Sequence, residues 1–199
     1  MTTVSTVAQL RAIIGEPNEH VPLKLHKALN ERAAAFIARS PMFMLSTTDA
    51  AGQPTVSPKG DSPGFVRVVD PGTLLIPERK GNKLIFSLQN VLANPKVGLI
   101  FLLPGTGETL RVMGEAELLD DRELCESFIE RGKPALLVMR VRISECYFHC
   151  AKAFLRSGLW DPHSWSEEMK ISFAAEIGID ATQGESFDAG VKERYKTDL

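Results

Sequence analysis

The chain has 199 residues, a formal net charge of -2 and 24% charged residues. This length suits one domain with appendages, and without a basic excess no nucleic-acid partner is expected. The first residues hold neither a basic stretch nor an unbroken apolar run, and no later segment is apolar for long enough to span a membrane. Neither a secretory signal nor a membrane partner is therefore expected. Three cysteines, few and odd in number, indicate a reducing, cytoplasmic setting.

Two helices are predicted before the first strand. Apolar residues recur at helical spacing over residues 5–14, and Gly15 follows as a stop signal. A second, one-sided helix is predicted over residues 25–37, because its apolar residues share one face and Pro41 ends the pattern.

The middle of the chain has the pattern of a β-rich fold. Residues 42–77 predict short strands in hairpins, because β-type segments alternate with turn residues. A helix is predicted over residues 83–93, with Asn82 as its N-cap. Residues 97–103 are apolar throughout, which is typical of a strand covered on both faces. Residues 110–118 alternate between apolar and polar, as in a half-buried strand.

Helical and strand signals continue toward the C-terminus. Asp120 begins a capping-box pattern that predicts a helix ending at Gly132. The last strand is predicted over residues 136–144. A final helix is predicted from Ser164, and the polar tail after Gly178 is expected to fray.

The order of these elements predicts the fold class. About six short strands interrupted by helices lack the regular strand and helix alternation of a doubly wound parallel sheet. The predicted fold is mainly β with α (α+β), a six-stranded antiparallel split β-barrel with flanking helices. Residues 1–40 are predicted to be an N-terminal helical extension, 41–160 the barrel and 161–199 a C-terminal helical extension of this single domain.

One candidate anion site follows a predicted strand that ends at Pro77. The cations Arg79 and Lys80 come next, and Gly81 and Asn82 lead into the predicted helix. The free backbone N–H groups of a helix start favour a bound phosphate, and the two cations would strengthen the site. The alternative is that the basic pair lies in a solvated turn.

A second cationic position lies on the preceding hairpin. Thr55, Ser57 and Lys59 share one face of an extended chain, so two hydroxyls and an ammonium point the same way. Pro58 cannot donate to a ladder and is expected where strand pairing stops. The alternative is an edge strand with a solvated lysine.

At these residues the sequence resembles the pyridoxamine 5'-phosphate oxidase-like FMN-binding split barrels, in order from about Phe43 to Leu118. The resemblance implies that Lys59 and the Arg79-Lys80 pair bind the FMN phosphate and ribityl chain. Thr109 falls where the oxidase itself uses a glutamine near the flavin. The predicted cofactor-binding residues, including those added from the helix start and from the C-terminal segment, are Ser57, Pro58, Lys59, Pro77, Arg79, Lys80, Asn82, Thr109, Arg156 and Trp160.

The segment over residues 146–165 differs from the oxidase's own substrate-binding and flavin-capping segment. It is similar to that of an FMN-dependent branch of the class in which such a segment follows the last strand. Arg156 and Trp160 are four residues apart, so on a helix they would share a face suited to stacking on the flavin of a partner subunit or to binding an acidic substrate. The alternative is that they pack and form salt bridges at a dimer interface.

A metal site is not predicted at Cys146, His149 and Cys150. Their spacing matches no paired Cys-x-x-Cys site, and no fourth ligand is evident. Buried thiols and a hydrogen-bonded histidine are the preferred interpretation, and no activating partner marks a cysteine nucleophile.

The resemblance implies an FMN-dependent oxidoreductase that transfers two electrons through FMN to or from a small-molecule substrate. It also implies a homodimer with FMN at the subunit interface. No catalytic residue is predicted, because the flavin carries the chemistry. The alternative is a non-catalytic protein that binds or senses a flavin on the same barrel, or one that exchanges FMN for haem or the deazaflavin F420.

Overall fold

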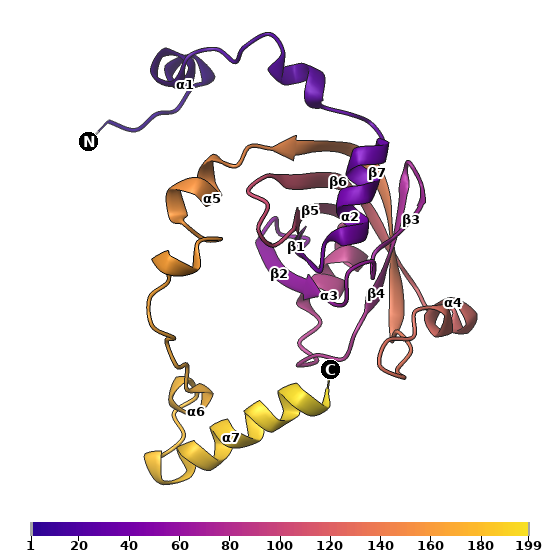
Figure 1. Cartoon of the computed structure of the whole chain (residues 1–199), viewed down its shortest axis with the longest axis vertical. Helices are drawn as coiled ribbons and strands as arrows, with labels where there is room; N and C mark the ends of the chain where they lie inside the picture. Colours follow the sequence, from indigo (N-terminus) through magenta and orange to yellow (C-terminus); the bar gives the residue numbers. More distant parts are fainter. Residues whose placement is uncertain (1, 199) are drawn as a thin grey trace.

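The computed structural model describes residues 2–198, and a seven-stranded antiparallel sheet lies at its centre (Figure 1). The strand order in the sheet is β2-β1-β5-β6-β7-β4-β3. The strands are β1 (Met42–Thr48), β2 (Pro54–Gly60), β3 (Arg67–Asp70), β4 (Thr73–Glu78), β5 (Lys96–Leu102), β6 (Thr109–Leu119) and β7 (Leu137–His149).

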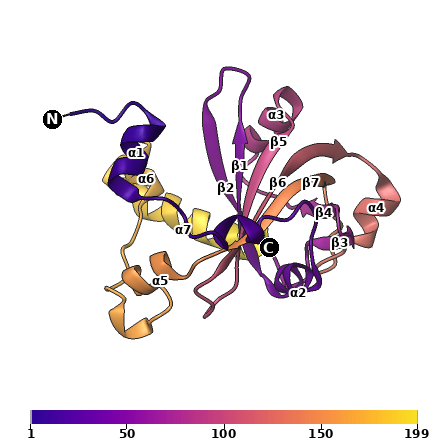
Figure 2. The same ribbon diagram turned by 90° about the horizontal axis from the view of Figure 1, so that it is seen from above.

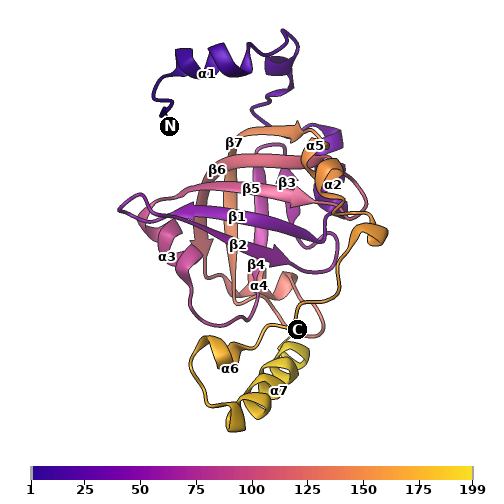
Figure 3. The same cartoon turned by 90° about the vertical axis from the view of Figure 1, so that its left-hand side faces the viewer.

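The sheet curls into a barrel because its two longest strands serve both halves. β6 pairs with β5 on one side and with β7 on the other, and the first half of β7 also pairs with β4. In Figure 3, β2, β1, β5 and β6 run across the view, and β7, β4 and β3 cross behind them. The end strands β2 and β3 share no ladder, so the barrel is split.

The predicted α+β split barrel is confirmed, but it has seven strands and not six. Residues 42–77, predicted to hold short strands in hairpins, contain β1 to β3 and nearly all of β4, and the shortest of these strands, β3, spans 4 residues. The predicted total was one strand too low.

Apolar side chains fill the barrel. Phe43 and Phe101, on neighbouring strands, are fully buried with ring centroids 5.1 Å apart. Each buried aromatic or aliphatic side chain stabilises the fold by about 1.5–3 kcal/mol. The largest fully buried side chains are Phe43, Phe101, Ile37, Leu45, Leu74, Leu99, Leu110, Met139, Val112, Val138, Val141 and Thr47.

Helices surround the barrel and extend from it. They are α1 (Val7–Ile14), α2 (Glu31–Arg39), α3 (Phe86–Ala93), α4 (Arg122–Ser127), α5 (Lys152–Ser157), α6 (Phe173–Glu176) and α7 (Ala181–Thr197), with the 3-10 helices η1 (Val21–Lys24) and η2 (Pro162–Ser164). Seen from above, α1, α5, α6 and α7 project to one side of the barrel (Figure 2). No helix within residues 2–198 is long and apolar enough to cross a membrane.

The second predicted helix starts later than expected. Its first half is extended, because the backbone of His26 forms ladder hydrogen bonds with Cys146. The helix α2 begins at Glu31, where the Asn30 side chain accepts a hydrogen bond from the N–H of Ala33 at 3.0 Å. The buried residues Ala33 and Ile37 then attach it to the core.

The prediction for the C-terminus was wrong in two respects. The helix expected from Ser164 is replaced by η2 and an extended stretch, and α6 begins after Ser172, whose hydroxyl accepts from the N–H of Ala175. The tail expected to fray forms α7, with Asp180 as its N-cap. This helix was not predicted because its sequence has only weak apolar periodicity. The cap at Asp180 is the signal of its start.

The strand β5 is covered on one face of the single chain and not on both. Val97, Leu99 and Phe101 point into the core, whereas the alternate residues Gly98 and Ile100 are half-exposed on the outer face. The predicted second cover is therefore not supplied by residues 2–198 of this chain.

A bulge between Met113 and Gly114 brings the backbone of β7 against β6. A Cβ atom on Gly114 would collide with the carbonyl oxygen of Arg142. Gly98, in a neighbouring strand, would meet only ordinary contacts, the nearest at 3.8 Å. The sharp bend of β7 therefore requires glycine at position 114.

We expect Gly114→Ala to lower the free energy of unfolding by about 1–3 kcal/mol, the usual cost of forcing atoms into a packed site. Gly98→Ala is the matched control and should change it by less than about 0.5 kcal/mol. Denaturant unfolding of both variants measures this difference. Equal stability of the two variants would contradict the close approach at the bulge.

Candidate functional site

Cations and carboxylates from two chain segments meet where β2 and β4 end, across the split in the barrel. Lys59, on β2, donates to both carboxylate oxygens of Glu78, on β4, at 2.7 and 2.6 Å. The two side chains are 17% and 19% exposed. This pair therefore links strands that share no ladder.

A second ion pair lies beside the first. The Nε of Arg79 donates to a carboxylate oxygen of Asp61 at 2.7 Å, and the Asp61 side chain is only 7% exposed. The Nη1 of Arg79 donates to the carbonyl of Phe128, just after α4. The Nη2 of Arg79 forms no hydrogen bond within residues 2–198 and is free to donate.

Lys80 points to the end of the chain. Its Nζ donates to Asp198 at 2.6 Å, and this hydrogen bond holds the pKa of the Asp198 carboxyl below its usual value. The pair is largely solvated, with side chains 53% and 32% exposed. We call the group formed by Lys59, Asp61, Glu78, Arg79 and Lys80 the charged corner.

The helix start predicted beside this corner is not where the sequence placed it. Asn82 does not cap a helix, since its side chain accepts from the N–H of Leu84 in a turn. The helix α3 begins only at Phe86. Lys83 and Ile85 before it have φ angles of 64° and 49°. Positive φ is rare for a β-branched residue such as Ile85 and marks a loop held in a strained conformation.

The other predicted residues near the corner differ in exposure. Ser57 is half-buried and Pro77 is buried within β4. Pro58 is exposed and lies within the ladder opposite Met44, and not where pairing stops as predicted, because β2 is an edge strand. Thr55, which shares a face with Ser57, is used by the fold, because it hydrogen-bonds Thr47 at 2.9 Å and Asn90 of α3 at 3.1 Å. This face of β2 therefore points into the barrel.

Thr109, Arg156 and Trp160 are not brought to the charged corner. Thr109 is 5% exposed at the start of β6. Arg156 is exposed at the end of α5, which stops at Ser157. Trp160 lies beyond this helix, so Arg156 and Trp160 do not share a helical face as predicted. The Nε1 of Trp160 donates to the carbonyl of Thr106 at 2.9 Å.

The cysteines and His149 do not form a common site, and the predicted buried thiol at Cys150 is wrong, because Cys150 is exposed after the end of β7. Cys146 is buried, donates to the carbonyl of Ala28 and has a pKa raised by burial. Residues 146 and 149 project from opposite faces of β7, because side chains alternate along a strand. No group of three potential ligands that could hold a metal occurs among residues 2–198. The Nδ1 of His149 has no hydrogen-bond partner there, so this histidine is not the hydrogen-bonded one expected.

Sequence reasoning missed the carboxylates of the charged corner. Glu78 directly precedes Arg79, and Asp61 follows Lys59 by two residues. Both were therefore visible as charges at strand ends. Their pairing across the split depends on the tertiary fold, which local patterns do not specify.

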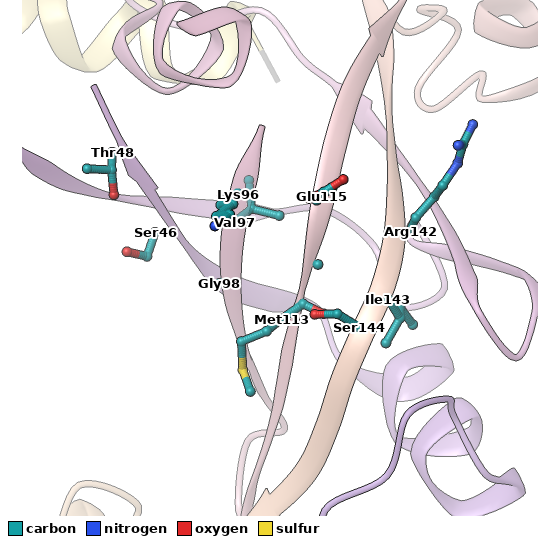
Figure 4. A pocket seen from close by; sticks show the side chains of 11 residues that line it. Ser46, Thr48, Lys96, Val97, Gly98, Met113, Glu115, Arg142, Ile143 and Ser144 are labelled. Atoms are coloured by element: carbon teal, nitrogen blue, oxygen red, sulfur yellow. The ribbon is translucent and has the colours of Figure 1, made fainter. Parts of the chain in front are cut away.

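A hollow of about 690 Å³ lies elsewhere, on the outer face of β1, β5, β6 and β7 (Figure 4). Gly98 and Gly114 leave space at its floor, and Met113 borders it. Its polar lining includes Ser46 and Ser144, and no residue of the charged corner takes part. The outer sheet face is thus indented where β5 lacks a second cover.

The chain is similar to solved structures of other proteins. A HupZ protein of Group A Streptococcus matches with a TM-score of 0.50 and 20% identity, covering 60% of this chain and 93% of that one. An FMN-binding protein of Syntrophomonas wolfei matches with a TM-score of 0.48 and 17% identity, covering 60% and 85%. General Stress Protein 26 of Bacillus anthracis matches with a TM-score of 0.44 and 15% identity, covering 57% and 88%.

Sequence comparison defines the family more directly. No curated protein matches the sequence. The family model described as pyridoxamine 5'-phosphate oxidase matches residues 29–150, which include all seven strands and the whole charged corner except its contact with Asp198. The chain therefore belongs to the pyridoxamine 5'-phosphate oxidase family.

Proposed function

We propose that the chain is an FMN-dependent oxidoreductase that holds the FMN phosphate at the charged corner and acts on a small-molecule substrate. The observation that carries the proposal is the meeting of Lys59 and Arg79, from separate segments, across the split in the barrel. Membership of the family supports it.

The residues of the corner fit a phosphate group. Arg79 keeps its Nη2 free, and Lys59 and Lys80 add compact charges. The strained loop before α3 follows Lys80 directly in the chain. Ser57, Pro58 and Pro77 would meet the ring and ribityl chain through their main chain, and Asn82 would border the phosphate. When bound, FMN supplies two-electron redox chemistry, and the protein fixes and tunes it.

A homodimer would complete the fold and the site. The outer sheet face carries the half-buried apolar side chains of Met44, Ile100, Leu102 and Met113, and the hollow lies among these strands. Figure 3 shows α1 above this face and α6 and α7 below it. A second copy seated on the face would give β5 the second cover that its sequence predicts. It would also bring Arg156, Trp160 and Thr109 of one copy toward the FMN of the other.

The double variant Arg79→Ala, Lys80→Ala should lose FMN, because two of the three cations proposed to bind the phosphate are removed. We expect its FMN affinity to fall at least about a hundredfold, from the loss of two charge-assisted contacts. The absorbance spectrum and mass of the co-purifying ligand measure retention, and Arg122→Ala, in the exposed pair with Glu126, is the control. FMN retention by the variant equal to that of wild type, or a haem or F420 spectrum of the wild-type protein, would contradict the proposal.

The non-catalytic alternative makes a different prediction. Protein that exchanges electrons with no tested donor or acceptor would favour it.

Removing a carboxylate of the corner should strengthen FMN binding. Glu78→Gln removes the carboxylate that pairs with the half-buried Lys59 ammonium, so that Lys59 can bind the phosphate. We expect about fivefold tighter FMN binding, because about 1 kcal/mol of Lys59–Glu78 attraction no longer has to be given up on binding. Asp198→Asn frees the exposed Lys80 and should give a smaller gain, because solvated pairs are weak. Fluorescence titration of FMN into apoprotein compares them. Weaker binding to folded Glu78→Gln would mean that Glu78 positions Lys59 and does not compete with phosphate.

Met44→Glu should separate the dimer. The substitution places a carboxylate on the apolar outer face, where burial against a second copy leaves it unpaired. We expect the dissociation constant to rise at least about a hundredfold, an effect of roughly 3 kcal/mol. Light scattering measures the mass of the particle, and Val69→Glu, on the exposed strand β3, is the control. A monomeric wild type would contradict the dimer.

A further inference from the structure

The half-buried cations of this protein fall into two groups. Within residues 2–198 they are Lys24, Lys59, Arg79, Arg111 and Arg140. Lys59, Arg79 and Arg140 each have a carboxylate within 2.8 Å. Lys24 and Arg111 have no ion pair in the described part of the chain. A partly desolvated cation without a counter-charge is costly, so these two require an explanation.

The two unpaired cations lie against the same tyrosine. The Nη1 of Arg111 donates to the hydroxyl of Tyr147 at 3.3 Å, and its guanidinium lies 5.9 Å from the ring centroid. The Nζ of Lys24 lies 5.3 Å from the same centroid. Arg111 and Tyr147 are paired residues of β6 and β7, and Lys24 belongs to η1, beside the segment that pairs with β7.

His149 extends this cluster. It pairs with Thr109, so it lies diagonally across the ladder from Arg111 on the same face. Burial lowers the pKa of His149 below its usual value, and the positive charges of Arg111 and Lys24 lower it further. The Nε of Arg111 and the Nδ1 of His149 are both buried without a hydrogen-bond partner in residues 2–198. Orphaned buried polar atoms of this kind indicate a missing ligand.

This cluster is separate from the charged corner. Lys59 pairs with the fully buried Phe43 and so faces into the barrel. Arg111 pairs with Ile100 on the outer face, and three strand spacings separate β6 from β2, about 14 Å. One phosphate group cannot contact both sites of a single chain.

We propose that Arg111, Lys24, His149 and Tyr147 form a binding site for a small organic anion that carries a carboxylate or phosphate group. The planar guanidinium of Arg111 suits the oxygens of either group, and Lys24 adds a point charge. The Tyr147 hydroxyl accepts from Arg111 and retains its own proton to donate to the anion. The site goes beyond the proposed FMN function and needs no flavin.

Anion binding should be coupled to protonation of His149. A bound anion favours the imidazolium and therefore raises the pKa of His149 from its depressed value. Affinity should then increase as pH falls through that pKa. The charged groups facing the ring include Lys24 from η1 and Arg111 from β6, and both disfavour its protonation in the absence of the anion.

The test is a titration of the full-length protein with inorganic phosphate or succinate at constant ionic strength. NMR of the histidine ring resonances reports the pKa of His149, with His163 as the internal reference. We expect either anion to raise the pKa of His149 and to leave the ring resonances of His163 unchanged. Arg111→Gln should weaken the response at least about tenfold, from loss of a charge-assisted fork. Lys24→Gln should weaken it less.

Arg142→Gln is the matched control, because this exposed arginine of β7 already pairs with Glu117. If Arg111→Gln does not fold, the response of Lys24→Gln tests the site instead. Lys24 lies in η1, before the first strand of the barrel, so its substitution should not disturb the sheet. The Arg79→Ala, Lys80→Ala variant should keep the His149 response while losing FMN, which separates failure here from failure of the proposed function. An unchanged pKa in wild type with either anion overturns the site. A second result would also overturn the site: Arg111→Gln becomes a monomer and wild type shows no anion response. In that case the counter-charge of Arg111 would be a carboxylate of a second copy and not a small anion.

Discussion

Two ion pairs bridge the split that the ladder hydrogen bonds of the barrel leave open. β2 and β4 share no ladder, so the pairs Lys59–Glu78 and Arg79–Asp61 are the polar contacts that join them. Half-buried pairs stabilise little in net terms, but breaking one leaves an uncompensated charge. The same cations are the ones proposed to bind phosphate. Fold stability and ligand binding at the charged corner therefore depend on one set of charges, and the apoprotein holds its phosphate-binding residues in place with internal carboxylates.

The contrast with Arg111 and Lys24 follows from the same principle. Carboxylates neutralise the cations that the fold needs across the split, whereas the cluster around Tyr147 has none within 4 Å in the described chain. Strand pairing explains why the aromatic ring is shared, since Arg111 and Tyr147 lie directly opposite each other. If Arg111 and Lys24 served only the stability of the fold, a carboxylate beside them would be favourable. The lack of an ion pair to either cation in the described chain is what distinguishes a site for an external anion from a structural ion pair.

Local signals predicted the strands well, because turn residues, alternation and apolar runs mark β1 to β6 and the first half of β7. They failed at two helix starts. The start of α3 follows the left-handed backbone of Ile85, which no sequence pattern announces, and the extended segment at His26 depends on a long-range ladder with β7. At the site, Lys59 and Arg79 were predictable as cations at strand ends. Their carboxylate partners were not, because pairing across the split exists only in the folded barrel. The role of Arg111 was hidden for the same reason.

The two cationic sites constrain how a single reaction would use both of them. They lie on opposite faces of the sheet, about 14 Å apart along it, so one phosphate group cannot occupy both sites of the same chain. A second copy seated on the outer face would bring its own anion cluster toward that of the first copy. The missing cover of β5 and the unpaired charge of Arg111 both lie on this outer face. A second copy and a bound anion would therefore occupy neighbouring parts of one surface, which is why the test must separate a partner carboxylate from a free anion.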